Sequence, residues 1–229
     1  MSTSSSRVGA VLAAVAAIGF VDPLLEPVVR ASEAWEVIAA GLFNPRGLTF
    51  GPEGALYVAE AGSGGTGPCV PGGEGSVRCY GPTGAITRVS PLALGGQIKV
   101  VTGLPSLAAQ GGFAADGPVD IAFLGRGEAY VVIGFGGNPL WRSDLGPVGS
   151  LFGTVLHFSA SWQLVQVSDV AAHELATNAD GADVDSNPYG LLTLPSRRVI
   201  ADAGANTLVD LDASGGAAPR QEVHHARGK

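Results

Sequence analysis

Four side chains in this sequence occupy matching positions and could form a binding site. The chain contains two Asn-Pro-x-Gly motifs, in which Arg46 and Tyr189 follow the proline. An acidic residue ends the apolar run that comes after each motif, Glu60 in the first case and Asp202 in the second. A guanidinium, a phenol and two carboxylates can together bind a small molecule or a metal ion. We therefore take these four residues as candidate ligand-binding residues. The alternative is that they are buried and hydrogen-bonded structural groups.

A dense cluster of oxygen ligands lies in one acidic loop. It comprises Asn178, Asp180, Asp183, Asp185 and Asn187. Calcium binds six to eight oxygens, so this loop could hold one ion. The last three residues match the start of a D-x-[DN]-x-[DN]-G calcium loop, but Pro188 replaces the required glycine and Leu194 the closing glutamate. The pattern favours solvated acidic turn residues. We predict no cofactor, with calcium as the alternative.

No sequence motif indicates a known catalytic machinery. G-x-S-x-G, H-E-x-x-H and P-loop patterns are all missing from the sequence. His157 falls within an apolar run that resembles a strand, and His173 within a short segment that could form a helical turn. Single histidines in such places are usually structural. The sequence thus favours a protein without enzymatic activity, and it offers no catalytic residue.

The two cysteines of the chain, Cys69 and Cys79, lie ten positions apart in a segment rich in Gly, Pro, Ser and Thr. Two cysteines at this spacing can close a small ring, and such a disulfide survives in an oxidising compartment. Free thiols and a metal site are the alternatives. A structural zinc site needs four ligands, and no pair of histidines lies nearby. We predict a Cys69–Cys79 disulfide.

Composition indicates an all-β protein. Hydrophobic residues make up 46% of the 229 residues, which is enough for a buried core. The 35 glycines and 15 prolines have no regular period, and they separate apolar runs of four to eight residues. The net charge is −7 with only 13 Lys and Arg, so no basic stripe is available to bind nucleic acid.

Residues 1–34 resemble an export signal. Arg7 provides a positive charge, and residues 8–21 form an unbroken run of apolar and small side chains. This run is too short for a stable membrane span, which needs about 20 apolar residues. We predict an extracytoplasmic protein, either periplasmic or secreted, which agrees with the expected disulfide. The alternative is an N-terminal apolar segment that stays on the protein.

A strand–turn–strand pattern occurs three times, and it organises the chain. The copies cover residues 44–62, 117–132 and 187–204. The prolines that begin them are separated by 73 positions, from Pro45 to Pro118, and by 70 positions, from Pro118 to Pro188. A repeated hairpin at nearly constant spacing predicts a series of similar sheets.

Additional apolar runs complete units of four strands. They cover residues 84–89, 97–101, 154–158, 162–167 and 207–212. Such units in series are typical of the blades of a β-propeller, in which each sheet covers the face of its neighbour. We predict a β-propeller of four-stranded antiparallel meander blades. About two and a half to three blades are expected, near residues 35–105, 106–180 and 181–216.

Several finer features are also predicted. Residues 35–40 alternate like a strand, residues 63–80 and 134–149 have the composition of loops, and residues 171–178 could form one or two helical turns.

In a propeller the first strand of each blade lines a narrow channel. We expect Gly47 and Gly190 to lie there, where crowding leaves no room for a side chain. Leu48, Ile121 and Leu191 are expected to surround one shared centre.

Four stretches of the chain resemble the ScyD/ScyE proteins: NPRGLTFGPEGALYVAEAG, CVPGGEGSVRCYGPTGAITRV, VDSNPYGLL and VIADAGANTLVDLD. That family carries NHL-type β-propeller repeats and is associated with the pathway to scytonemin, a cyanobacterial sunscreen pigment. The resemblance covers roughly residues 35–212 and implies an exported propeller without established catalytic residues. In NHL-type repeats, carboxylates like Glu60 and Asp202 often tie the turns of neighbouring blades, which is the structural alternative for these two residues.

Members of the family are usually longer than this chain. Residues 217–229 form an atypical tail, because they lack strand alternation and their charge density changes abruptly. An open stack of blades would leave strand edges unpaired. We therefore expect the chain to be a truncated or frame-shifted copy.

The sequence thus predicts an exported, non-catalytic β-propeller that binds an unknown small molecule or protein. The family resemblance implies a link to secondary metabolism of the scytonemin kind. One alternative is a metal-dependent hydrolase of the lactonase type on a six-bladed propeller, in which Glu60 and Asp202 would help to hold a channel cation. The other is a fragment without function.

Overall fold

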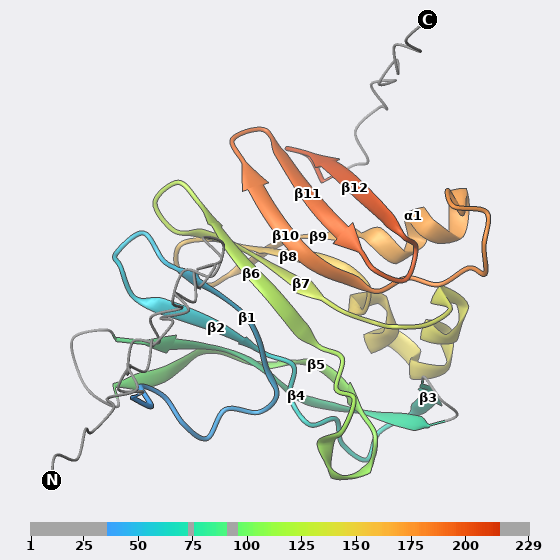
Figure 1. The fold of residues 1–229 in the computed structure, drawn as a ribbon, viewed down its shortest axis with the longest axis horizontal. Coiled ribbons are helices and arrows are strands. Elements are labelled where there is room, and N and C mark those ends of the chain that lie inside the picture. Colours follow the sequence, from blue (N-terminus) through green and yellow to red (C-terminus); the bar gives the residue numbers. More distant parts are fainter. Residues whose placement is uncertain (1–35, 73–75, 91–95, 216–229) are drawn as a thin grey trace, which may run out of the picture. The chain divides into compact units, whose positions relative to one another are not determined.

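The computed structural model describes residues 36–72, 76–90 and 96–215 (Figure 1). The chain divides into two compact units, Met1–Glu36 and Val37–Lys229, and all that follows concerns the second. The predicted signal and the atypical tail lie outside the described residues. Within the described residues, no helix has the length and apolar character needed to cross a membrane.

The first sheet is an antiparallel meander with one additional short strand. It consists of β1 (Pro45–Phe50), β2 (Leu56–Glu60), β4 (Val77–Val89), β5 (Gln97–Ala108) and the short β3 (Cys69–Pro71). β2 pairs with the C-terminal half of β4 and β3 with its N-terminal end, while β5 runs along the other side of β4.

Two more antiparallel meanders follow along the chain (Figure 1). The second sheet contains β6 (Pro118–Leu124), β7 (Glu128–Ile133), β8 (Thr154–Phe158) and β9 (Leu164–Asp169), and the third contains β10 (Pro188–Leu194), β11 (Arg197–Asp202) and β12 (Thr207–Asp212). The helix α1 (Val170–Thr177) leads from β9 towards the third sheet, which confirms the predicted helical turns. The described chain is therefore mostly β, and all strand pairs are antiparallel.

The three predicted hairpins are present and share one register. In each hairpin the first proline of the first strand pairs with the end of the second strand: Pro45 with Glu60, Pro118 with Ile133 and Pro188 with Asp202. A β-bulge follows the proline in all three copies. The sequence repeat is thus a structural repeat down to the position of the bulge.

Two apolar cores hold the sheets together. The larger core, which includes Tyr57, Ile86 and Val131, lies between the first and second sheets. The smaller core, which includes Val132 and Ile200, lies between the second and third sheets. Within this arrangement β6 contacts both β1 and β10. The second sheet is therefore covered on both faces, and successive side chains along its strands point alternately into the two cores.

The residues Leu48, Ile121 and Leu191 are equivalent in register but differ in burial. Ile121 is 2% exposed in the larger core, and Leu191 packs half-buried against the smaller one. Leu48 is 61% exposed. Each of these side chains lies on the face that covers the preceding sheet, and no described sheet precedes the first. The expectation that the three side chains surround one shared centre therefore does not agree with the exposure of Leu48.

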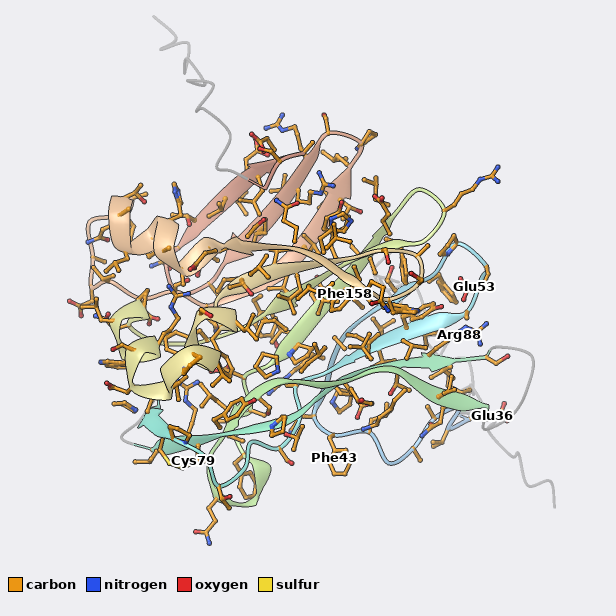
Figure 2. The ribbon with its side chains drawn as sticks, turned by 180° about the vertical axis from the view of Figure 1, so that it is seen from behind. Glu36, Phe43, Glu53, Cys79, Arg88 and Phe158 are labelled. Atoms are coloured by element: carbon orange, nitrogen blue, oxygen red, sulfur yellow. A yellow bond between two sulfur atoms is a disulfide. The ribbon has the colours of Figure 1, made fainter. Side chains whose placement is uncertain are left out.

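A polar cluster fixes the turn of the first hairpin. Glu53, in the β1–β2 turn, accepts hydrogen bonds from the hydroxyl of Tyr57 (2.6 Å) and from Nε of Arg88 (2.9 Å). Figure 2 labels Glu53 and Arg88 at this end of the sheet. The hydrogen bond from Tyr57 and the charge of Arg88 lower the pKa of Glu53, although desolvation acts in the opposite direction.

Three sequence predictions about local structure were wrong. Residues 36–40 form no strand, and the backbone of Ala40 forms hydrogen bonds with the side chain of Gln97 instead of with a neighbouring strand. The expected loop 63–80 contains β3 and the start of β4. The expected loop 134–149 contains most of the 3-10 helix η3 (Pro139–Leu151), which is interrupted at Gly146.

Local interactions explain the two unexpected elements. A ladder with Cys69 opposite Cys79 extends β4 well beyond the predicted strand. At the start of η3, Asn138 accepts a hydrogen bond from the backbone N–H of Leu140 (3.0 Å), and Pro139 occupies the first turn, where its missing N–H has no cost.

Candidate functional site

The first strands of the three sheets meet at an open cleft of about 430 Å³. Each strand contributes residues from the start of its hairpin, where the bulge lies. The lining residues are Pro45, Arg46, Gly47, Val119, Asp120, Tyr189 and Gly190. Because bulges redirect side chains next to functional sites, the shared bulge explains why the three strand starts open onto one place.

The cleft brings together two of the four predicted site residues. Arg46 is exposed, and its Nη2 donates a hydrogen bond to the backbone oxygen of Ala115 (3.0 Å), which comes from the segment before β6. Tyr189 is 46% exposed. Both side chains therefore remain accessible to a ligand, and the guanidinium of Arg46 keeps donors beyond the one used by Ala115.

Gly47 allows β1 and β6 to approach each other closely. A Cβ atom at this position would lie 2.3 Å from Oδ1 of Asp120 and 2.8 Å from the backbone oxygen of Val119. The predicted crowding is thus confirmed for Gly47. It was wrong for Gly190, where a Cβ atom would meet only Cβ of Ala201 at an ordinary 3.6 Å.

Asp120 is the cleft residue that the sequence reasoning missed. Its Oδ1 accepts a hydrogen bond from the backbone N–H of Ile121 (2.8 Å), and its Oδ2 accepts one from Leu191 (2.8 Å). The carboxylate thus joins β6 to β10. A signal was present in the sequence, because Asp120 occupies the position that Gly47 and Gly190 hold in the other two copies.

Glu60 does not line the cleft. Its side chain is fully buried and accepts hydrogen bonds from the backbone N–H of Phe43 (2.6 Å) and from the hydroxyl of Thr87. The ammonium of Lys99 lies 3.5 Å from its Oε2. Glu60 therefore holds the segment before β1 against β2 and β4.

Asp202 has the same role in the third sheet. It is 2% exposed, and its Oδ2 accepts a hydrogen bond from the hydroxyl of Ser186 (2.7 Å). Its Oδ1 accepts backbone N–H bonds from Asn187 (2.6 Å), Gly204 (3.1 Å) and Ala205 (3.2 Å). Both carboxylates thus bind segments of their own sheet, and this arrangement favours the structural alternative for them.

Asp180 of the acidic loop is engaged in local hydrogen bonds. Asp180 caps its own turn at the backbone N–H of Ala182 (2.9 Å) and accepts a hydrogen bond from Asn206 (2.8 Å). Burial, and repulsion by Asp180 and Asp202, raise the pKa of Glu174. Within the described ranges, no group of three His, Cys, Asp or Glu side chains is arranged to hold a metal ion. Calcium binding by this loop was the alternative to solvated turn residues, and it stays untested.

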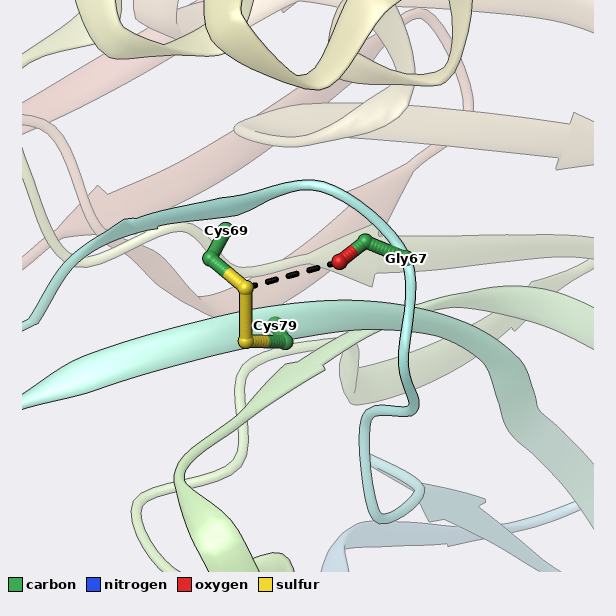
Figure 3. Close-up of a disulfide and its surroundings, with 3 residues drawn as sticks. All are labelled: Gly67, Cys69 and Cys79. Carbon is green, nitrogen blue, oxygen red and sulfur yellow. Dashed lines mark hydrogen bonds between the residues drawn. A yellow bond between two sulfur atoms is a disulfide. The ribbon is translucent and has the colours of Figure 1, made fainter.

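The predicted disulfide is present. Cys69 in β3 is bonded to Cys79 in β4, and the two residues face each other in the ladder (Figure 3). The Sγ atom of Cys69 also lies 3.4 Å from the carbonyl oxygen of Gly67. The bond closes a ring formed by residues 69–79, which include β3 and the start of β4. It lies next to Arg78, a buried residue that donates a hydrogen bond to the backbone oxygen of Phe135 in the segment after β7.

The pKa of Asp120 gives the cleft a testable pH dependence. Burial raises this pKa, and the N–H groups of Leu191 and Ile121 act in the opposite direction. The folded protein therefore holds the proton more tightly than the unfolded chain. As the pH rises, the unfolded chain ionises first, so the stability of the fold decreases until the pH has passed the raised pKa, and above that pH the loss stays constant.

We expect the stability of the wild type, relative to an Asp120→Asn variant, to fall as the pH rises from the ordinary pKa of an aspartate, about 4, through the raised value. Urea denaturation of both proteins at each pH measures this difference, and a carboxyl NMR titration locates the pKa of Asp120 directly. If the wild type instead became more stable relative to Asp120→Asn as the pH rises, the fold would stabilise the ionised carboxylate and the expectation would be wrong.

Comparisons with known proteins give limited information. The chain matches no protein-family model and no curated protein. One solved structure to which it is similar comes from Thermus thermophilus and is described, by assignment, as an oxidoreductase (glucose dehydrogenase). The alignment has 20% identity and a TM-score of 0.38, and it covers 77% of this chain. The chain spans 63% of that protein's length. A similarity at this level carries no argument about activity.

Proposed function

We propose that the three sheets are blades of a β-propeller and that the protein is an exported, non-catalytic binding scaffold. The three hairpins share one register and one bulge, and each sheet packs its broad face on the next. These are the packing relations of propeller blades. The resemblance to the ScyD/ScyE family supports the same fold, and it is the basis for proposing a link to scytonemin-like secondary metabolism.

One observation carries the binding role: three successive sheets place Arg46, Asp120 and Tyr189 around one cleft. Pockets that bind small molecules combine an apolar or aromatic surface with a few polar groups that fix orientation. The cleft offers a guanidinium for an acidic group, an aromatic ring for stacking and a carboxyl for a hydroxyl or amine. An aromatic carboxylic acid with a ring hydroxyl has this set of groups.

The partners of the buried carboxylates support a scaffold over a metal-dependent hydrolase. Glu60 and Asp202 are the carboxylates that a channel cation would need, and both already accept hydrogen bonds from N–H and O–H donors. Binding a cation there would require these donors to be given up. The Cys69–Cys79 disulfide supports an extracytoplasmic location.

Binding of 4-hydroxybenzoate, measured by calorimetry and by ligand-observed NMR, tests the proposed site. For a ligand of this size we expect a dissociation constant on the order of 1 mM. Arg46→Ala and Tyr189→Ala should each weaken binding about tenfold, because each removes one of the two main contacts. Arg126→Ala, in the β6–β7 turn outside the cleft, is the matched control and should bind like the wild type.

Undiminished binding by the Arg46→Ala and Tyr189→Ala variants would place the ligand elsewhere and reject the site. A parallel assay with γ-butyrolactone and calcium separates the scaffold from the hydrolase. Calcium-dependent turnover would reject the non-catalytic role.

A further inference from the structure

The stack of sheets has an apolar surface at each of its two ends. The second sheet lies between the first and the third (Figure 1). The first end face is the side of the first sheet that is turned away from the second, where Leu48 and Phe50 are exposed. The second end face is the corresponding side of the third sheet, where Leu192 and Leu208 are exposed. The described part of the chain contains no fourth sheet that would cover either face.

The two junctions between the sheets show what covers such a face. Ile86 of β4 and Val155 of β8 occupy equivalent places, because each lies in the third strand of its meander, opposite the second-last residue of the hairpin. Each shares an apolar core with the equivalent residue in the first strand of the next sheet. Ile86 lies in the larger core with Ile121, and Leu191 packs against the smaller core, which contains Val155.

The two end faces carry the separate halves of a third junction of this kind. Leu208 of β12 holds the place of Ile86, since it too lies opposite the second-last residue of its hairpin. Leu48 of β1 holds the place of Ile121. Their equivalents are buried in the larger core, whereas Leu208 is 75% exposed and Leu48 is exposed as well. A first sheet placed on the second end face would therefore repeat the packing that already occurs twice in the chain.

Gly190 gives independent support for a strand that packs on the third sheet. The equivalent Gly47 is crowded by the next sheet, because a Cβ atom there would lie 2.8 Å from the backbone oxygen of Val119 in β6. At Gly190 a Cβ atom would meet only Cβ of Ala201, at 3.6 Å. The third sheet thus has the glycine that the close approach of a following strand requires, although no described strand approaches it.

We propose that a second copy of this chain covers both end faces and closes a ring of six sheets. The first sheet of each copy packs on the third sheet of the other, so that Leu48 of one copy lies beside Leu208 of the other. The two junctions are related by a two-fold axis, and a head-to-tail interface of this kind closes without free ends. Six sheets agree with the usual size of propellers, about four to eight blades. The inference rests on the propeller packing proposed above.

The area of the end faces is sufficient for a stable pair. Strand spacing and rise give one face of a three-stranded sheet with six-residue strands an area of roughly 300 Å². Ring closure buries four such faces, roughly 1,200 Å² in total, which is the size of the smaller stable protein interfaces. A single junction would bury roughly half of this area, which is typical of weak contacts. The closed pair is therefore favoured over an open chain of copies.

Sedimentation of the full chain tests the ring. We expect a single species with the mass of two chains and a dissociation constant on the order of 1 μM. Leu208→Glu should weaken association more than about 100-fold, because it places a charge in the apolar junction. Gly190→Val should do the same, because its side chain occupies the space of the incoming strand. Leu164→Glu is the matched control, since Leu164 is exposed on β9 of the second sheet, and it should keep the dimer.

A mixing experiment tests the head-to-tail arrangement. Leu48→Glu blocks the first end face and Leu208→Glu the second, so each variant alone should be a monomer. In a mixture, the intact second end face of the Leu48→Glu chain can bind the intact first end face of the Leu208→Glu chain. Isotope-labelled Leu48→Glu should therefore show NMR shift changes when unlabelled Leu208→Glu is added. Addition of unlabelled Leu48→Glu should cause none.

A monomeric wild type would overturn the inference, and so would a mass that keeps increasing with concentration, as expected of an open chain. A dimer that survives Leu208→Glu or Gly190→Val would place the contact elsewhere. A mixture without shift changes would reject the head-to-tail arrangement. The 4-hydroxybenzoate titration, carried out on the same protein, reports on the proposed function separately. A monomer that binds this ligand would refute the ring alone.

Discussion

Replacing Asp202 with alanine is expected to lower the free energy of unfolding by about 3 to 5 kcal/mol. The carboxylate is almost fully buried and accepts four hydrogen bonds, one from the Ser186 hydroxyl and three from backbone N–H groups. Alanine leaves all four donors without their partner in a site that water does not reach. Such a loss is a large part of the total stability of a domain. Denaturation in guanidinium chloride measures it.

Two further variants show whether the hydrogen bonds cause the effect. Asp202→Asn keeps one carbonyl oxygen for the backbone donors, and the hydroxyl of Ser186 can accept instead of donate, so most of the stability should remain. Asp210→Ala removes a carboxylate that pairs with Arg197 at the surface and should cost less than about 1 kcal/mol. Equal losses for Asp202→Ala and Asp210→Ala would contradict the role given to Asp202.

Replacing Arg78 with methionine is expected to cost about 3 to 5 kcal/mol, because it breaks a buried charge pair. Arg78 is buried in β4, and its guanidinium donates to the backbone oxygens of Phe135 (2.8 Å), Gly136 (2.9 Å) and Pro71 (3.1 Å). It also pairs with Asp116. Methionine fills similar space but leaves the carboxylate and three carbonyl groups without this donor.

The same denaturation experiment provides a control and a rescue. Arg88→Met removes an arginine of the same strand whose pair with Glu53 is exposed, and it should cost less than about 1 kcal/mol. Arg78→Met combined with Asp116→Asn should be less destabilised than Arg78→Met alone, since the uncompensated carboxylate is then removed. A double variant that is equally unstable or worse would show that Arg78 acts through its carbonyl contacts alone.

The hairpins and the disulfide were predictable from sequence because their signals are local. Apolar runs of four to eight residues around turns that contain Gly or Pro specify a strand pair without reference to the rest of the chain. The repeat placed Pro45, Pro118 and Pro188 at equivalent positions, and the structure gives them the same register. Two cysteines ten positions apart could meet in a single ladder. The extent of β4 could not be predicted, since the composition of residues 63–80 is that of a loop.

Which residues line the cleft depends on which sheets lie next to each other. Arg46 and Tyr189 line the cleft because the proline and the bulge fix where they lie, and their binding of a ligand stays a prediction. Glu60 and Asp202 look equally functional in the sequence. Only their hydrogen bonds to Phe43 and Asn187 show that they hold the backbone of their own sheets.

By itself, the sequence determined the three hairpins and the disulfide, because contacts between neighbouring segments encode them. The tertiary structure alone decided which faces became buried. Packing of one sheet on the next left Leu48 exposed while it buried Ile121. It also turned Asp120 into a link between two strands and enclosed the charge of Arg198. Burial and the supply of donors and acceptors depend on residues far away in the chain, and no local pattern records them.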